Sequence, residues 1–138
     1  MPETQRFVAA AFCIIKDSKL LLVRSRNKRA FYLPGGKIET GESHIEAVCR
    51  ELSEELSISL DQSSLSLYGV FVAQAYGEPE GVFVELHCFM GSYDGSIRAS
   101  GEIADVQFVT LESYRAMPET APAVVLLLHQ LHADAIIA

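Results

Sequence analysis

The sequence predicts an α/β sandwich, in which a mixed β-sheet packs against helices within one domain that spans residues 1–138. Apolar residues make up 49% of the chain, which is enough to bury a core. Apolar runs of strand type occur early, in the middle and late in the sequence, and two segments of helical periodicity lie among them. One central and one terminal helix combined with such strands are typical of the α/β class.

The N-terminal third begins with a predicted β-hairpin. Residues 7–15 form an apolar run rich in Val, Ile and Phe, residues 20–23 form another, and the KDSK segment between them is typical of a turn. Residues 25–30 are a polar, basic loop. Residues 32–36 are expected to end any regular element, because Pro and paired Gly interrupt backbone ladders and allow unusual backbone angles.

The central helix is marked by its N-terminal cap. Ser43 can cap the helix and Glu46 follows three residues later, which is the pattern of a capping box. Apolar residues then recur at helical spacing and form one face, namely Ile45, Val48, Cys49, Leu52 and Leu56. Acidic residues occupy the opposite side of this helix.

The second half of the chain is predicted to contain three strands and a closing helix. Residues 65–75 and 82–90 are predicted strands, and residues 106–109 form a shorter one. Residues 118–122, which begin and end with Pro, precede a helix that is expected to run to about His132.

Charge and cysteine pattern exclude several classes of function. The formal net charge is −7, so we expect no binding to a nucleic-acid polymer, whose affinity comes from Lys and Arg. The three cysteines form no CxxC pair, which argues against a zinc site and a disulfide scaffold and favours a cytoplasmic protein. Residues 1–7 lack a signal pattern, and the apolar run 121–128 is far shorter than the roughly 20 residues of a membrane span. We therefore expect no membrane partner.

The acidic face of the central helix carries the strongest functional signal. Glu51, Glu54 and Glu55 stand at i, i+3 and i+4, which gathers three carboxylates within one turn. Such a cluster repels itself unless a hard cation with a preference for oxygen ligands is bound. The alternative is a solvated helix face with salt bridges to Arg50.

The segment around these acids resembles the signature of the Nudix hydrolases, in the MutT-like form. The run GKIETGESHIEAVCRELSEELSI, residues 36–58, matches a Gly, five residues, a Glu, seven residues and then Arg-Glu-aliphatic-any-Glu-Glu. The matching positions are Gly36, Glu42, Arg50, Glu51, Leu52, Glu54, Glu55 and Ile58. The lead-in FYLPGGKIE is also similar to the family's approach to this motif. One position departs, because Ser57 stands where the family has a Gly that favours a left-handed helix end.

The resemblance implies a Nudix-type α/β/α sandwich and a hydrolase of nucleoside diphosphate-linked substrates that uses Mg²⁺ or Mn²⁺. By this resemblance Glu51, Glu54 and Glu55 would hold one or more metal ions, helped by the carbonyl of Gly36. Arg50 and Glu42 would form a structural ion pair between the loop and the helix. The substrate would be a small nucleotide.

The reaction requires a carboxylate that takes a proton from the attacking water. Glu54 and Glu55 are candidates within the motif. Glu102, in a Gly-Glu-Ile turn before the strand 106–109, is a third candidate, either as the base or as a further metal ligand. Its alternative role is that of an exposed loop acid.

Substrate contacts are expected from the basic loop and its neighbours. Arg24 is predicted to contact phosphate, because a guanidinium matches phosphate oxygens. Phe31 is predicted to stack on a base, although a core position is equally compatible with its sequence context. Tyr76 lies at about the distance from the motif that dinucleoside polyphosphate hydrolases of the family show.

Three functions remain open from the sequence. The first is a pyrophosphohydrolase of nucleoside triphosphates or their modified forms, and the second is a hydrolase of dinucleoside polyphosphates or nucleotide sugars. The third is a Nudix-like module that senses a nucleotide without cleaving it, which the intact set of acids argues against. Residues 124–128 are apolar on nearly all sides of their helix, so a homodimer is a further expectation.

Overall fold

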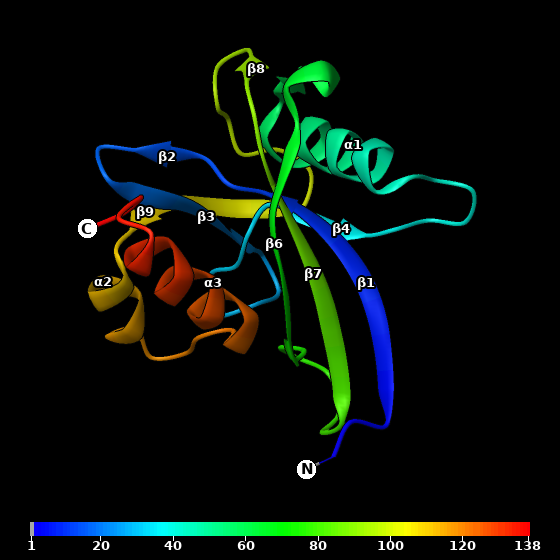
Figure 1. Cartoon of the computed structure of the whole chain (residues 1–138), viewed down its shortest axis with the longest axis vertical. Coiled ribbons are helices and arrows are strands. Elements are labelled where there is room, and N and C mark those ends of the chain that lie inside the picture. Colours follow the sequence, from blue (N-terminus) through cyan, green and yellow to red (C-terminus); the bar gives the residue numbers. More distant parts are fainter. Residues whose placement is uncertain (1) are drawn as a thin grey trace.

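The computed structural model describes residues 2–138 and contains three α-helices and nine strands (Figure 1). The strands are β1 (Gln5–Phe12), β2 (Ile15–Lys16), β3 (Lys19–Ser25), β4 (Gly35–Lys37), β5 (Ser59–Leu60), β6 (Ser66–Gln74), β7 (Val82–Met90), β8 (Tyr93–Asp94) and β9 (Ile103–Val109). The helices are α1 (His44–Leu56), α2 (Leu111–Arg115) and α3 (Pro122–Ala133), with a 3₁₀ turn at Gln62–Ser64.

Two sheets form the centre of the fold. The larger sheet has the order β4-β1-β7-β6 and is mixed, because β1 and β7 are parallel whereas the other neighbours are antiparallel. The smaller sheet has the order β2-β3-β9. Helix α1 lies on one side of these sheets and α2 and α3 lie on the other (Figure 1). The predicted α/β sandwich is confirmed.

Alternate residues of β1 separate two apolar cores. Ala10 and Phe12 belong to the core that packs against α1, whereas Ala11 belongs to the core that packs against α3. This alternation follows from the two-residue period of a strand. A sheet that is buried on both faces therefore places the side chains of β1 in both layers.

The N-terminal hairpin forms as predicted, with its turn at Asp17 and Ser18, which both have positive φ. The expected strand 7–15 is interrupted, however. It leaves the larger sheet after Phe12, and β2 pairs with β3 in the smaller sheet. The chain thus crosses from one sheet to the other at residues 13–14. This crossing could not be predicted from the sequence, because the apolar run is continuous there.

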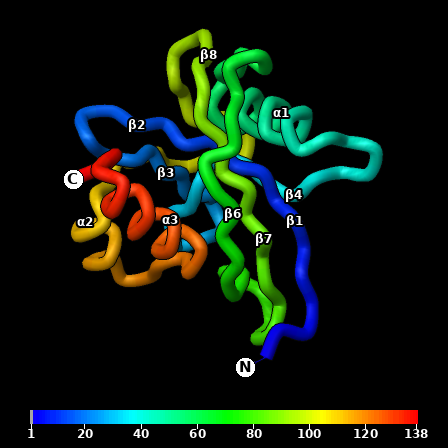
Figure 2. Tube along the Cα trace, in the orientation of Figure 1, coloured from blue at the N-terminus to red at the C-terminus, as the bar shows by residue number. Residues whose placement is uncertain are grey.

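The expectation that residues 32–36 end regular structure is wrong. Gly35–Lys37 forms β4 and pairs antiparallel with β1, a strand that Figure 2 traces beside β1. A Cβ on Gly35 would lie 2.2 Å from the carbonyl oxygen of Ala10, so only glycine permits this approach. The paired glycines serve close packing here rather than a break in the ladder.

The later elements match the predicted ones, β7 with the same ends and β6 with ends shifted by one residue. Strand β9 begins three residues before the predicted 106–109, and α2, capped by Thr110, was not predicted because it has only one turn. Helix α3 begins at Pro122, a position that suits proline because its missing N–H would have no partner there. No helix in residues 2–138 combines the length and the apolar character that a membrane span requires.

Candidate active site

Helix α1 begins at the capping box that the sequence predicts. The Ser43 hydroxyl accepts a hydrogen bond from the N–H of Glu46 at 3.0 Å, and the Glu46 carboxylate accepts one from the N–H of Ser43 at 2.8 Å. Val48, Leu52 and Leu56 are fully buried on the opposite face. The cap and the apolar face together fix the rotation of α1, and hence the direction of its acidic face.

A bidentate ion pair ties the loop before α1 to the helix. Arg50 Nε lies 2.7 Å from Glu42 Oε2, and Arg50 Nη2 lies 3.0 Å from Glu42 Oε1. The hydrogen bond from Arg50, together with the backbone N–H of Glu39, lowers the pKa of the Glu42 carboxyl. Glu42 and Arg50 are therefore placed where the family resemblance expects a structural pair.

Strand β4 lies against the acidic face of α1. A Cβ on Gly36 would lie 2.6 Å from Glu51 Oε1, so the Glu51 carboxylate rests directly on the backbone of Gly36. Glu51 Oε1 also accepts a hydrogen bond from Arg50 Nη1 at 2.8 Å. This contact brings a backbone segment and a carboxylate, both sources of oxygen ligands, to one point.

Glu55 is the most perturbed acid of the site. Burial, a hydrogen bond from its carboxyl to Glu51 and the negative charge of Glu51 together raise the pKa of Glu55 to about 10, against the opposing effect of the Gly35 N–H. Its Oε1 atom is buried and has no hydrogen-bond partner. A buried, unpartnered carboxylate oxygen beside a second carboxylate is a position that a divalent cation would satisfy.

Glu54 is far more exposed than Glu51. Its side chain is 59% exposed, and its Oε2 lies 3.5 Å from Arg50 Nη1. Within residues 2–138 no three His, Cys, Asp or Glu side chains are arranged as a preformed metal cluster. Arg50 Nη1 thus lies between the carboxylates of Glu51, at 2.8 Å, and Glu54, while Glu51 also pairs with the buried Glu55. The donor set still fits a divalent cation, since Glu54 extends from the same face of α1.

The loop that carries Glu102 is fastened to the C-terminal end of α1. Ser100 N donates to the carbonyl of Glu55 at 2.9 Å, and Ser100 Oγ donates to the carbonyl of Glu54 at 2.6 Å. Arg26 holds the other side, because its N–H donates to the carbonyl of Glu102 at 3.0 Å. These bonds set Glu102 at the start of β9, next to the acidic face of α1.

Ser57 ends α1 in the conformation that the family's glycine would favour. Its φ is 59° and its ψ is 32°, in the left-handed region, and its N–H donates to Ser53 O at 3.2 Å. Its hydroxyl donates to Ser100 Oγ at 3.1 Å. The exit path of the chain is therefore retained despite the missing glycine, with backbone strain at Ser57.

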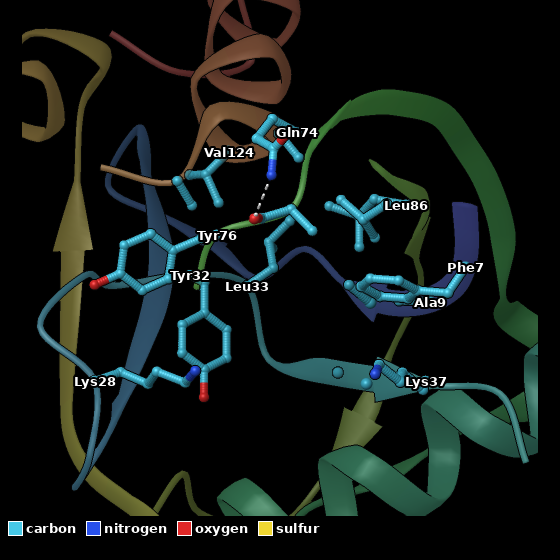
Figure 3. Close-up of a pocket in the computed structure, with 17 residues that line it drawn as sticks. Phe7, Ala9, Lys28, Tyr32, Leu33, Lys37, Gln74, Tyr76, Leu86 and Val124 are labelled. Atoms are coloured by element: carbon cyan, nitrogen blue, oxygen red, sulfur yellow. Dashed lines mark hydrogen bonds between the residues drawn. The ribbon is translucent and has the colours of Figure 1, made fainter. Parts of the chain in front are cut away.

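A cavity of about 230 Å³ opens beside β4 (Figure 3). Apolar side chains of β1, β7 and α3 dominate its walls, including Phe7, Ala9, Leu86 and Val124, and Gly35 and Gly36 line one end. The cavity therefore adjoins the strand on which Glu51 rests. The polar side chains that line it are Lys28, Tyr32, Lys37, Gln74 and Tyr76.

Arg24 and Phe31, which were predicted to bind substrate, do not line this cavity. Arg24 Nη1 donates to the carbonyls of Ser25 and Lys28 at 3.4 and 3.2 Å, and the guanidinium lies 5.9 Å from the ring centroid of Phe31. The alternation of an extended chain directs Tyr32 into the cavity and its neighbour Phe31 elsewhere. Contact between Arg24 or Phe31 and substrate stays a prediction.

Most of the cavity residues carry no local signal in the sequence. The two-residue period of β1 is one feature from which cavity residues could be predicted, because it places Phe7, Ala9 and Ala11 on the same face of the strand. Tyr76, whose position in the sequence is similar to that of a Tyr in dinucleoside polyphosphate hydrolases, lines the cavity. Its hydroxyl bonds to Glu119 and accepts from the N–H of Ala30 at 3.3 Å. Lys28 was considered only as part of the basic loop.

Comparisons with known proteins identify the family of the chain. A model of the NUDIX domain matches residues 6–129. The chain is 33% identical over 109 residues to an ADP-ribose pyrophosphatase of Methanocaldococcus jannaschii, an alignment that covers 77% of this chain and 63% of that protein. It is 31% identical over 91 residues to a Bacillus subtilis protein provisionally named an 8-oxo-dGTP diphosphatase, covering 64% of this chain and 56% of that protein. The chain thus spans less than two thirds of the length of either relative.

Among solved structures, the MutT protein from Methanosarcina mazei Go1 has the same fold, with a TM-score of 0.75 and 22% identity. The superposition covers 98% of this chain and 99% of that protein.

Proposed function

The chain belongs to the NUDIX domain family, and we propose that it is a divalent-metal-dependent hydrolase of nucleoside diphosphate-linked substrates. We propose further that the substrate is a nucleoside triphosphate or a modified form of one, cleaved as by a pyrophosphohydrolase. One observation carries this proposal: the Glu51–Glu55 carboxyl pair, with its unpartnered buried oxygen, adjoins Gly36 at the end of an apolar cavity. A substrate could hold its base in the cavity and its diphosphate at the acids.

The metal would be Mg²⁺ or Mn²⁺, because carboxylate and carbonyl oxygens are the ligands that these ions prefer. Glu51, Glu54, Glu55 and the Gly36 carbonyl would hold it. A bound ion of this kind neutralises phosphate charge and lowers the pKa of water. NUDIX proteins generally require a divalent metal, and the buried oxygen of Glu55 fits one.

The chain's own residues would bind, orient and accept a proton. The cavity holds the base and excludes water from it, and the Arg50–Glu42 pair keeps the loop of Gly36 in place. Three acids are candidates to take the proton from the attacking water, namely Glu54, Glu55 and Glu102. Glu102 is supported by the bonds that fasten its loop to α1.

A second candidate function is the hydrolysis of a nucleotide sugar or a dinucleoside polyphosphate. The similarity to a protein named ADP-ribose pyrophosphatase favours the nucleotide sugar. A nucleotide sensor that does not hydrolyse its ligand is the remaining alternative, which the complete set of acids opposes. The cytoplasmic location and the homodimer stay predictions.

Phosphate or pyrophosphate release from a panel of nucleotides tests this proposal. The panel should contain the common and the 8-oxo nucleoside triphosphates, ADP-ribose, other nucleotide sugars and dinucleoside polyphosphates, each with Mg²⁺, Mn²⁺ or EDTA. We expect turnover only with metal, and fastest with a triphosphate. Tight binding without turnover of any compound would support the sensor instead.

Replacement of Glu102 by Gln separates the candidate bases. If Glu102 is the base, turnover falls by roughly 100-fold or more while metal affinity is unchanged. Glu80→Gln, in the exposed turn between β6 and β7, is the matched control and should keep the wild-type rate. An unchanged rate for Glu102→Gln would leave Glu54 and Glu55 as the candidates.

A further inference from the structure

Tyr32 occupies the boundary between the cavity and the acids. It lines the cavity, and its backbone forms an isolated bridge with Val23 of β3, with N···O distances of 2.8 Å in both directions. Figure 3 shows its ring between the cavity and the side on which α1 lies, with the hydroxyl directed away from Tyr76 and Val124. The ring thus faces the base site while the hydroxyl points toward the helix of the carboxylates.

The hydroxyl of Tyr32 is held by a buried partner. It shares a hydrogen bond with Ser25 Oγ, and Ser25 at the end of β3 is only 6% exposed, the one buried polar residue in the described part of the chain. Either oxygen can be the donor in this bond. When Ser25 donates, the hydrogen of the Tyr32 hydroxyl is free to be donated to another acceptor.

The Tyr32 hydroxyl is also affected by the charges of the acidic residues. Burial raises the pKa of Tyr32, the bond to Ser25 opposes this effect, and the charges of Glu55, Glu102 and Glu51 raise it further. The carboxyls of two separate segments, α1 and the loop before β9, therefore act on this one oxygen. The hydroxyl marks the place where the base cavity ends and the acidic site begins.

We propose that the Tyr32 hydroxyl donates a hydrogen bond to the diphosphate of the substrate, while its ring forms a wall of the cavity that holds the base. This inference rests on the proposed function and assigns a further substrate-binding residue to that site. A molecule with its base in the cavity and its diphosphate at Glu51 and Glu55 must pass Tyr32. Ser25 donates to Tyr32 and thereby orients the phenol toward the phosphate.

Calorimetry with non-hydrolysable ligands tests this inference. Wild type and Tyr32→Phe are titrated, in Mg²⁺, with the α,β-methylene analogues of ADP, GDP, CDP and UDP and with the matching nucleosides. Phe retains the ring and removes only the hydroxyl. The Kd of the diphosphate analogue should rise roughly tenfold or more, whereas the Kd of the nucleoside should change less than about twofold.

Two further variants remove the ambiguities of this comparison. Tyr76→Phe is the matched control, because Tyr76 lines the same cavity but its hydroxyl bonds to Glu119. It should leave the ratio of the two Kd values at the wild-type value. Ser25→Ala combined with Tyr32→Phe leaves no buried hydroxyl without a partner, and it should lose diphosphate affinity to the same extent as Tyr32→Phe.

The outcomes separate this inference from the proposed function. If Tyr32→Phe weakens nucleoside and diphosphate equally, weakens neither, or behaves like Tyr76→Phe, the inference is overturned while the function stands. If wild type binds the analogues but hydrolyses no compound of the panel, the proposed function fails and the ratio of Kd values still decides the role of Tyr32. If wild type binds no analogue, the inference is overturned, and turnover of the nucleotide panel alone decides the proposed function.

Discussion

The two sides of β4 differ in how their residues are brought together. On the α1 side, Gly36, Glu51 and Glu55 come from one short segment, and a capped helix fixes their positions. On the cavity side, Phe7 and Val124 are separated by most of the chain and meet only through the sheet and α3. The comparison teaches that the acidic site is encoded locally, whereas the base site depends on the whole fold.

The largest effect on turnover is expected from a change on the α1 side of β4. Glu54→Gln should lower turnover by roughly 100-fold or more and leave the fold intact, because Glu54 is a solvent-exposed metal ligand in our proposal. Steady-state kinetics with saturating Mg²⁺ measure the rate, and circular dichroism checks the fold. Near wild-type turnover would mean that Glu54 is not a metal ligand and that only Glu51 and Glu55 remain as candidates.

The pH dependence of stability should reveal the buried acid. Glu55 has a folded-state pKa of about 10, raised from 4.5, so the folded protein retains a proton that the unfolded chain loses. Its stabilising contribution is complete below pH 4.5 and is lost as the pH rises toward 10. The free energy of unfolding in EDTA should fall by up to about 1.4 kcal/mol per pH unit in this window.

Urea unfolding of wild type and Glu55→Gln in EDTA, at pH 6 and pH 9, measures this effect. The variant has no proton to lose, so its two values should differ less than those of wild type. An equal fall in both proteins would assign the pH dependence to other groups.

The ion pair of the loop should contribute to stability and to activity. Arg50→Lys keeps the charge but removes the bidentate geometry with Glu42, and we expect a small fall in the free energy of unfolding, because ion pairs near the surface contribute little. Thermal and urea unfolding measure this change. An unaltered stability would mean that the loop of Gly36 is held by β4 alone.

The smallest effect concerns the end of α1. Ser57→Gly should stabilise the protein by about 0.5–1 kcal/mol, because glycine adopts the left-handed conformation without strain. The loss of the weak bond to Ser100 and the greater freedom of glycine in the unfolded chain limit the gain. A destabilised variant would show that the bond to Ser100 outweighs the strain.

The same contrast explains which predictions the sequence allowed. Ser43 and Glu46 identify the start of α1 because a cap acts between near neighbours, and the spacing of the acids then places them on one face. The different surroundings of the acids could not be predicted, since the burial of Glu55 beside Glu51 and the exposure of Glu54 depend on how α1 packs in the fold.

The cavity that is proposed to hold the base could not be predicted from local sequence patterns. The sequence suggests Phe31 as a contact to the base and gives no signal for Tyr32, which the bridge to Val23 directs into the cavity. Strand β4 was missed because its glycines form a strand only when β1 lies against them. Such features require the packed structure, in which distant segments restrict one another.

Titration of Mn²⁺ followed by electron paramagnetic resonance tests the central claim most directly. Wild type should bind Mn²⁺, and Glu51→Gln and Glu55→Gln should each weaken that binding at least about tenfold. The control Glu80→Gln should bind like wild type. Absence of Mn²⁺ uptake by wild type, or equal uptake by all four proteins, would contradict a metal site on the acidic face of α1.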